Sequence, residues 1–221
     1  MIQLVIFDLD GVLLDSESLY KRVNFQLFSD LGVEITDEEY NSFIGISGAK
    51  MWGYIKKKGL LDQSIEELRV MERERKFEGL SSETLIPNPG LLDLLNELKK
   101  RDVPCAIASS GLMKNIRLIL SKLDVESYFT HIVSGEMPKN GKPAPDIFLL
   151  AADHYGINPE NCMVIEDSRN GVLAAKAAGM KCVGYINEGS GNQDLSKADL
   201  IIDSLVDSEV KRIFNHHSTG Y

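Results

Sequence analysis

The sequence predicts an α/β fold with a doubly wound, mainly parallel sheet and an inserted α-helical subdomain. Short β-rich runs alternate with amphipathic helical patterns over most of the 221 residues, and one long gap between two runs contains helical signals only. Strand-helix-strand repetition of this kind is typical of a parallel sheet covered on both faces. The chain is 43% hydrophobic, which suffices for a substantial core at this length.

The six runs predicted to be strands are Leu4–Phe7, Cys105–Ser109, Ile132–Ser134, Cys162–Ile165, Lys181–Ile186 and Leu200–Ile202. After the long gap, Asn88 is expected to cap a helix that has Pro89 at its first position, where the missing N–H is not needed. The side chains of this helix expected to face inward are Leu91, Leu92, Leu95 and Leu98. A later helix is expected to end at Gly179, because glycine readily takes the left-handed conformation that follows a helix.

The gap from Asp15 to Thr84 carries helical signals only. Its first helix is predicted from apolar residues at i, i+4 spacing, namely Leu19, Val23, Leu27 and Leu31. Gly32 follows them and would end that helix. Thr36 and Ser64 each precede a glutamate by three residues, the pattern of a capping box that opens a helix.

Several helices in a row exceed what one crossover between parallel strands needs. We therefore expect two parts: a catalytic core of residues 1–14 and 85–221, and a helical cap of residues 15–84. The cap is expected over the carboxyl edge of the sheet, where α/β proteins bind ligands. Its charged run Met71–Lys76 is interpreted as a solvated face.

Charge and cysteine content limit the function classes. A formal net charge of −9 and a pI near 5.0 argue against binding to nucleic acid or acidic membranes, because little positive charge is available to neutralise many phosphates. The three cysteines are odd in number and widely spaced, which favours reduced thiols and a cytoplasmic setting. Because strand-like sequence begins at Gln3, we expect no leader, and no apolar run approaches the roughly 20 residues of a membrane span.

Acidic side chains follow two of the predicted strands. Because side chains two apart on a strand point to the same face, Asp8 and Asp10 are expected to point the same way. Glu166 and Asp167 come at the end of a later strand, just before a helix. Paired carboxylates in such places supply ligands for hard cations, and ligation by oxygen alone favours Mg²⁺ over zinc.

Two further segments offer groups for a phosphate. Ser109-Ser110-Gly111 places a hydroxyl and a small-residue turn at the expected start of a helix, where free N–H groups and the helix dipole favour an anion. Lys142 lies in a loop whose backbone is restricted by two prolines. Carboxylates gathered at one edge repel, by about 4 kcal/mol for two charges about 4 Å apart at an effective dielectric of about 20. A divalent cation and Lys142 would reverse that cost, so the pattern predicts metal-assisted chemistry on phosphate.

With these segments the chain resembles the haloacid dehalogenase superfamily over nearly its full length. The family motifs occur in order as Asp8-Leu-Asp10-Gly11, Ser109, Lys142 and Glu166-Asp167. Further similarity in the segment that ends Gly-Lys-Pro-Ala-Pro-Asp-Ile-Phe148 indicates the β-phosphoglucomutase and sugar-phosphatase branch, which inserts a helical cap after the first motif. The resemblance implies the sheet order 3-2-1-4-5.

The resemblance implies a Mg²⁺-dependent phosphatase that hydrolyses a small phosphorylated metabolite, such as a sugar phosphate, through an aspartyl-phosphate. Asp8 would be the nucleophile and Asp10 the general acid and base. The metal ligands would be Asp8, the Asp10 carbonyl, Asp167 and Glu166. The transferring phosphate would be bound by Ser109, the Ser110 N–H, Gly111 and Lys142.

A β-phosphoglucomutase-like isomerase is the main alternative. That resemblance expects a basic cap residue soon after a Gly-Val-Ser element, but here Gly45-Ile-Ser47 is followed by Gly48, and the nearest cation is Lys50. Tyr20 stands where the branch has a cap histidine. Both departures favour a phosphatase, with Lys50 as a candidate cap contact for the substrate. A phosphonatase that uses a cap lysine, and a binding protein without turnover, remain open, as does the oligomeric state.

Overall fold

The computed structural model describes residues 1–43, 46 and 48–206, and these form two compact units. One unit consists of Met1–Asp15 and Leu85–Tyr221, of which residues 207–221 lie outside the described part. The other unit is Ser16–Thr84. Two residues of the Gly45-Ile-Ser47 element, Gly45 and Ser47, also lie outside the described residues.

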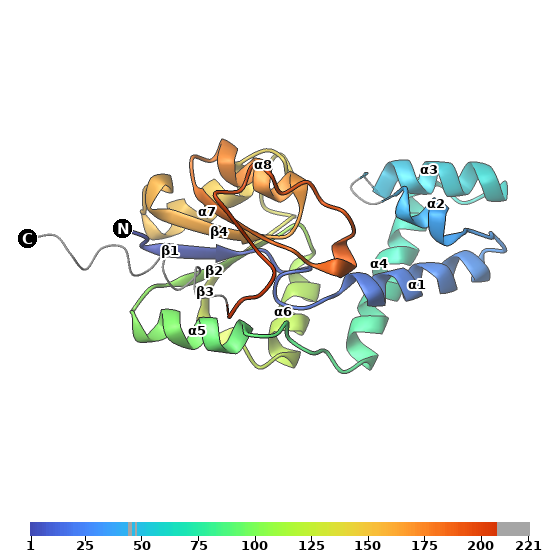
Figure 1. The fold of residues 1–221 in the computed structure, drawn as a ribbon. Coiled ribbons are helices and arrows are strands. Elements are labelled where there is room, and N and C mark those ends of the chain that lie inside the picture. The colour runs from blue at the N-terminus through green and yellow to red at the C-terminus, as the bar shows by residue number, and fades with distance from the viewer. Residues whose placement is uncertain (44–45, 47, 207–221) are drawn as a thin grey trace, which may run out of the picture. The chain divides into compact units, whose positions relative to one another are not determined.

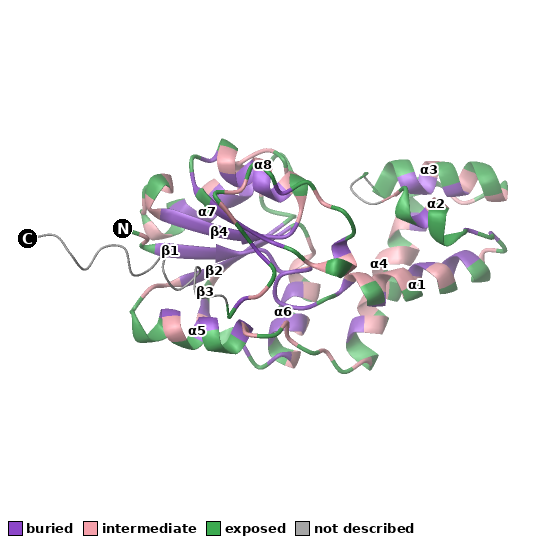
Figure 2. Cartoon of the chain, viewed as in Figure 1, coloured by how far each residue is buried: buried purple, intermediate pink, exposed green. Residues whose placement is uncertain are grey.

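The first unit is built on a parallel sheet (Figure 1). Its strands are β1 (Leu4–Phe7), β2 (Cys105–Ser109), β3 (Phe129–Ser134), β4 (Cys162–Glu166), β5 (Lys181–Tyr185) and β6 (Leu200–Ile202). The order β3-β2-β1-β4-β5-β6 confirms the expected sheet and adds the last predicted strand at the edge beside β5. The central strands β1 and β4 are buried along their whole length (Figure 2), as expected for a sheet covered on both faces.

The strand bounds depart from the predicted ones most at β3, which begins at Phe129 rather than Ile132. Phe129 belongs to the core, because it is buried and its ring packs edge-on against Phe7 with centroids 5.7 Å apart. Thr130 and His131 interrupt the apolar pattern, and β3 accommodates them because it is an edge strand. The ends of β4 and β5 each differ from the prediction by one residue.

Helices cover both faces of the sheet (Figure 1), with α5 and α6 on one face and α7 and α8 on the other. Their bounds are α5 (Leu91–Lys100), α6 (Met113–Lys122), α7 (Asp146–Tyr155) and α8 (Arg169–Ala177). Short 3-10 turns are η1 (Glu126–Tyr128), η2 (Pro159–Asn161) and η3 (Glu188–Ser190). As predicted, Gly179 follows the last of these α-helices in the left-handed conformation, with φ of +76°.

The predicted start of the helix at Asn88 and Pro89 is wrong. This helix, α5, begins at Leu91 after Gly90, which has φ of +85°. The Asn88 side chain instead donates to the carbonyls of Gly11 (2.9 Å) and Val12 (3.0 Å), so it ties this segment to the loop after β1. The inward leucines are Leu91, Leu94, Leu95 and Leu98, at the i, i+3, i+4, i+7 spacing of one helix face. Leu92, which was expected to face inward, lies off that face and is 43% exposed.

The second unit is helical in its described residues. Its helices are α1 (Glu17–Asp30), α2 (Asp37–Asn41), α3 (Gly48–Gly59) and α4 (Ile65–Ser82). Both predicted capping boxes form: the hydroxyls of Thr36 and Ser64 accept from the N–H three residues ahead, at 3.2 Å in each case. Gly32, with φ of +71°, follows the C-cap of α1.

This second unit has its own apolar core. The rings of Phe28 and Trp52 meet edge to face with centroids 5.6 Å apart, and Leu27, Ile55 and Leu68 pack around them. The charged run Met71–Lys76 lies in α4 and agrees only in part with the predicted solvated face: Glu74 and Arg75 are exposed, whereas Met71 packs against the apolar cluster and Glu72 accepts a hydrogen bond from Trp52. This unit therefore buries an apolar cluster of its own beneath a charged surface.

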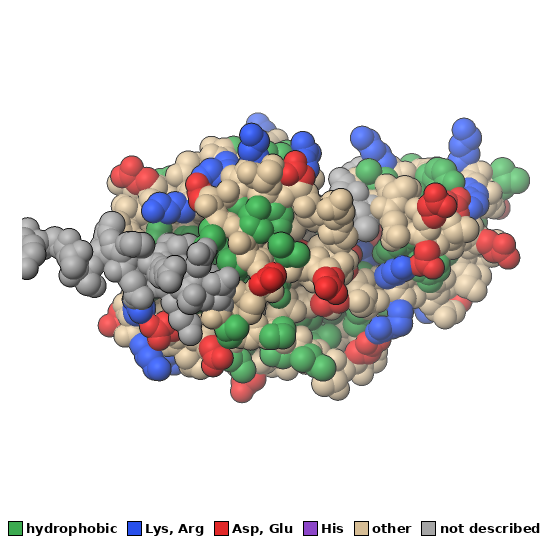
Figure 3. All heavy atoms as spheres, in the orientation of Figure 1, with side chains coloured by type: hydrophobic (Ala, Val, Ile, Leu, Met, Phe, Trp, Pro, Cys, Tyr) green, Lys and Arg blue, Asp and Glu red, His purple; other side chains and the backbone are tan. Residues whose placement is uncertain are grey.

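The molecular surface carries charges of both signs. On the face drawn in Figure 3, Lys and Arg side chains stand among Asp and Glu side chains rather than in one continuous basic stretch. None of the helices in the described part of the chain has the length and apolar character needed to cross a membrane.

Candidate active site

Two neighbouring strands bring the predicted carboxylates together. β1 and β4 run parallel with Phe7 opposite Ile165, so the residues that follow, Asp8 and Glu166, come side by side at the carboxyl edge. The Asp8 N–H donates to the Ile165 carbonyl at 3.0 Å, which extends the pairing by one step. Asp8, Glu166 and Asp167 are all buried.

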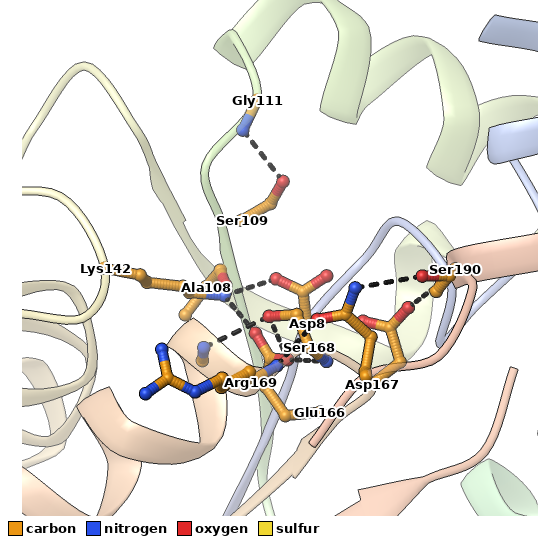
Figure 4. Close-up of polar contacts among 12 residues, drawn as sticks. Asp8, Ala108, Ser109, Gly111, Lys142, Glu166, Asp167, Ser168, Arg169 and Ser190 are labelled. Atoms are coloured by element: carbon orange, nitrogen blue, oxygen red, sulfur yellow. Dashed lines mark hydrogen bonds and ion pairs between the residues drawn. The ribbon is translucent and has the colours of Figure 1, made fainter. Parts of the chain in front are cut away.

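Lys142 links these strands through its ammonium group (Figure 4). The ammonium donates to a carboxylate oxygen of Asp8, to Oε1 of Glu166 at 2.7 Å and to the Ala108 carbonyl at 3.2 Å. Only 6% of the Lys142 side chain is exposed. The loop before α7 therefore delivers one buried cation to the ends of β1, β2 and β4, as the sequence predicted for a held lysine.

Glu166 is held by more than the lysine. Its second oxygen, Oε2, accepts from the N–H of Ser168 at 2.7 Å and from the Ser168 hydroxyl at 2.9 Å. The same hydroxyl accepts from the N–H of Gly171 at 3.1 Å, so Ser168 also caps α8. A Cβ on Gly171 would lie 1.7 Å from Oε1 of Glu166. The glutamate thus lies directly against the first turn of α8, and only glycine leaves room for it.

The Ser109 loop lies at the end of β2. The buried Ser109 hydroxyl accepts from the Gly111 N–H at 3.0 Å. A Cβ on Gly111 would lie 3.2 Å from Oγ of Ser109 and 3.9 Å from Oδ2 of Asp10, so the structure brings this turn close to the Asp10 carboxylate. Ser110 is exposed. The helix α6 begins at Met113, two residues beyond this turn, so the turn precedes the helix start rather than forming it.

Lys50 belongs to the second unit. It is an exposed residue near the start of α3 in the second unit. Its contact with a substrate therefore stays a prediction.

The cluster of carboxylates carries unbalanced negative charge. Burial raises the pKa of Asp8 to about 7, although Lys142 opposes the shift. Burial, together with the nearby carboxylates of Glu166 and Asp8, raises the pKa of Asp167 well above its ordinary value. Burial lowers the pKa of Lys142, but Asp8 and Glu166 outweigh this effect and hold that pKa above its ordinary value. One ammonium thus lies beside two carboxylates, Asp8 and Asp167, whose pKa values are both raised.

The donor set fits a hard metal ion. Asp8, Glu166 and Asp167 each offer an oxygen, and these oxygens lie within 4.8 Å of one another. Carboxylate oxygens are the ligands that Mg²⁺ and Ca²⁺ prefer. A divalent cation would also favour the ionised forms of Asp8 and Asp167, whose pKa values are raised by burial first and by neighbouring carboxylates second.

Two serines that the sequence did not assign to the site complete it. Ser168 directly follows Glu166-Asp167 and precedes a helix, so its type and position were a usable capping signal. Ser190 donates its hydroxyl hydrogen to Asp167 from the loop after β5. No local pattern indicates that contact, since the two residues are 23 positions apart.

Known proteins are similar to this chain over most of its length. Residues 5–185 match the model of the haloacid dehalogenase-like hydrolase family. The chain is 34% identical over 177 residues to the phosphorylated carbohydrates phosphatase of Thermotoga maritima, a match that covers 80% of this chain and 82% of that protein. It is 36% identical over 189 residues to the chloroplastic protein SUPPRESSOR OF QUENCHING 1 of Arabidopsis thaliana; that match covers 81% of this chain and spans 17% of the plant protein.

A solved structure is also similar to this chain over nearly its whole length. The β-phosphoglucomutase of Clostridium difficile is similar with a TM-score of 0.79 at 27% identity, over 98% of this chain and 99% of that one. The family match includes the segments that contribute Asp8, Glu166 and Asp167 to the acidic cluster. On this evidence the chain belongs to the haloacid dehalogenase-like hydrolase family.

Proposed function

We propose that this protein is a Mg²⁺-dependent phosphatase that hydrolyses a small phosphomonoester, such as a sugar phosphate. The observation that carries the proposal is the setting of Asp8, whose buried carboxylate is bound by Lys142 within one acidic cluster with Glu166 and Asp167. A carboxylate can attack a phosphoryl group when cations beside it reduce repulsion from the phosphoryl oxygens.

In the proposed reaction Asp8 attacks phosphorus in line. A phosphorus–oxygen bond forms to the Asp8 carboxylate while the bond to the ester oxygen breaks. Asp10 gives a proton to the leaving oxygen and later accepts one from the water that hydrolyses the aspartyl-phosphate. The position of Asp10 supports this role, because it follows Asp8 by two residues and its carboxylate lies close to the turn at Gly111.

Lys142 contributes charge and orientation. An ammonium has three hydrogens, and here they have three acceptors: Asp8, Glu166 and the Ala108 carbonyl. The contact with Ala108 is the longest at 3.2 Å, so it is the one that a phosphoryl oxygen would replace. Ser109, the Ser110 N–H and Gly111 would bind the remaining phosphoryl oxygens.

The metal would be held by Asp8, Asp167, the Asp10 carbonyl and Glu166. When bound, Mg²⁺ supplies positive charge to the phosphoryl oxygens and to the crowded carboxylates. Both oxygens of Glu166 already accept hydrogen bonds from Lys142 and Ser168. Asp8 and Asp167 therefore have the most capacity left for the ion, and Glu166 would contribute with its remaining lone pairs or through water.

A relative supports the proposed substrate class. The Thermotoga maritima relative is named for phosphorylated carbohydrates, and we assign the same class to this chain. We further propose that the core of residues 1–14 and 85–221 performs the chemistry, while residues 15–84 act as a cap that selects the ester. Lys50, a cation on the surface of α3, is the candidate cap contact for a polar or anionic part of the substrate.

Phosphate release from a panel of esters tests this proposal. The panel contains p-nitrophenyl phosphate and sugar phosphates, among them β-glucose 1-phosphate, assayed with Mg²⁺ and again with EDTA. We expect Mg²⁺-dependent release that falls by about 10³-fold or more in Asp8→Asn, which keeps the shape but removes the nucleophile. Asp93→Asn, an exposed change on α5, is the matched control and should retain full activity. Equal activity of Asp8→Asn and the unmodified protein would rule out the proposed nucleophile.

A mutase is the second candidate, because the β-phosphoglucomutase of Clostridium difficile is similar over nearly the whole of both chains. The two activities differ in product. A phosphatase releases inorganic phosphate and glucose from β-glucose 1-phosphate, whereas a mutase forms glucose 6-phosphate without net release. Measuring both products in one assay distinguishes them.

A further inference from the structure

A loop that follows β5 delivers a hydroxyl to the acidic cluster. The loop spans residues 186–199, between β5 and β6, and includes η3. Within it, the buried Ser190 donates its hydroxyl hydrogen to Oδ2 of Asp167 (Figure 4). We infer that Ser190, oriented by Asn187, is a positioning residue that presents the Asp167 carboxylate to a divalent cation. This inference rests on the proposed function, because it concerns how the same cluster binds its metal.

The direction of the hydrogen bonds is set by the backbone. The Gly189 N–H donates to Oδ1 of Asn187 at 3.1 Å, so the carbonyl end of that amide side chain must face Gly189. The NH₂ end then faces Ser190 and donates to its Oγ at 3.0 Å. A hydroxyl has a single hydrogen, and that hydrogen is directed to Asp167. Asn187 therefore leaves Ser190 with one role, to donate to the carboxylate.

Close packing holds Asp167 from a second side. A Cβ on Gly11 would lie 1.8 Å from Oδ2 of Asp167 and 3.0 Å from Oγ of Ser190, so the Gly11 backbone lies directly against this hydrogen bond. The loop also packs closely against Asp15, since a Cβ on Gly189 would lie 2.3 Å from Oδ1 of that residue. Between Gly11 and Ser190, Oδ2 is engaged, and Oδ1 is the oxygen left for a cation.

A carboxylate held in this way is ready for a metal before the metal arrives. A hydrogen bond to an ionised acceptor is stronger than one between neutral groups, and partners that orient metal ligands typically contribute 10–100-fold to metal affinity. Without the Ser190 hydroxyl, Asp167 would lose a donor in a buried place. It would then be free to turn away from Asp8 and Glu166, which repel it. A binding cation would then have to bring the Asp167 carboxylate back into its ligating position.

Mg²⁺ binding to the metal-free protein, measured by isothermal titration calorimetry, tests the inference. We expect Ser190→Ala to weaken Mg²⁺ binding by about tenfold. Ser190→Thr keeps the hydroxyl and should bind Mg²⁺ as tightly as the unmodified protein. Asn187→Ala should give a smaller loss, because Ser190 can still donate. Ser121→Ala, the same chemical change at an exposed position on α6, should bind as the unmodified protein does.

Phosphatase kinetics give a second readout. In Ser190→Ala the Mg²⁺ concentration for half-maximal rate should rise by about tenfold, and kcat should recover at saturating Mg²⁺. A loss of kcat that saturating Mg²⁺ does not restore would contradict a positioning role. Unfolding curves recorded in EDTA establish that each variant is folded before metal is added.

The results of these Mg²⁺ measurements distinguish a failure of the inference from a failure of the proposed function. If folded Ser190→Ala binds Mg²⁺ as tightly as the unmodified protein, the inference is overturned and the proposed function stands. If the unmodified protein binds no Mg²⁺, the proposed function fails first and the inference with it. Should Ser190→Ala not fold, Asn187→Ala decides, since unchanged Mg²⁺ affinity in that variant would contradict the role given to this loop.

Discussion

Lys142 and Asp8, 134 positions apart in the sequence, form a buried ion pair at the carboxyl edge of the sheet. β1 lies between β2 and β4, so a lysine that reaches Asp8 at the end of β1 also reaches Ala108 of β2 and Glu166 of β4. One side chain thereby ties three adjacent strands together at the place where the carboxylates gather.

Lys142→Met should leave Asp8 and Glu166 buried without their shared cation. We expect the free energy of unfolding of the metal-free protein to fall by about 3 kcal/mol, because an uncompensated buried charge remains. Urea titration measures this. In the control, Lys176→Met, the lost ion pair with Asp199 has side chains 35% and 47% exposed, so the loss should stay below about 1 kcal/mol. Equal losses in the two variants would contradict the account of Lys142.

Gly171→Ala should destabilise the protein and reduce its activity. Alanine in a helix ordinarily gains about 1 kcal/mol over glycine, but here the new Cβ would lie 1.7 Å from Oε1 of Glu166 and displace it from Lys142. Gly53→Ala in α3 is the matched control, because its Cβ would meet nothing closer than 3.8 Å. In thermal unfolding, the melting temperature should fall in Gly171→Ala and rise in Gly53→Ala. A stabilised Gly171→Ala protein would refute the close packing of Glu166.

Asp167→Asn should have opposite effects with and without metal. In EDTA the variant should melt higher by roughly 2–4 °C, the shift that about 1 kcal/mol produces at this size. The reason is that asparagine removes one of the mutually repelling carboxylates while still accepting from Ser190. Added Mg²⁺ should stabilise the unmodified protein, by about 2.7 kcal/mol at 100 times its Kd. The variant should show almost none of that stabilisation. Scanning fluorimetry over a Mg²⁺ series measures both, and a full Mg²⁺ response in the variant would exclude Asp167 as a ligand.

The cysteines should be unreactive while the protein is folded. Burial raises the pKa of Cys105 and Cys182 to about 12 and that of Cys162 to about 11, and the thiolate is the reactive form. At pH 8 we expect a disulfide reagent to modify them about 100-fold more slowly than in urea. The three thiols should react together on unfolding. A cysteine that reacts in native buffer at its unfolded rate would contradict its burial.

The same thiols predict a pH dependence of stability. The folded state favours the neutral thiol. The contribution of each buried thiol to the free energy of unfolding is therefore complete below the ordinary pKa of 9.0, and it is lost as the pH rises from there through the raised values. Stability should therefore fall above about pH 9. Urea titrations between pH 7 and 10.5 measure this, and replacing Cys105 with alanine should reduce the slope.

Signals contained within a few residues were predicted well. Thr36 and Ser64 form the expected capping boxes because both partners of each box lie three residues apart. Asn88 fails for the opposite reason. It has the residue type of a helix cap, but its amide binds the carbonyls of Gly11 and Val12, 77 and 76 positions away, and these distant acceptors decide where α5 begins.

By itself the sequence determined the two strands that bring Asp8 and Glu166 to the edge of the sheet and the loop that carries Lys142, since strand period, capping and turn chemistry act locally. The sheet order came from the family resemblance and is confirmed. Only the tertiary structure decided how the carboxylates are held. Ser190 reaches Asp167 because β5 lies beside β4, and Gly11 and Gly171 matter because carboxylates lie where their side chains would be. Such contacts depend on which segments the packed sheet brings within hydrogen-bonding distance, and no local pattern encodes that.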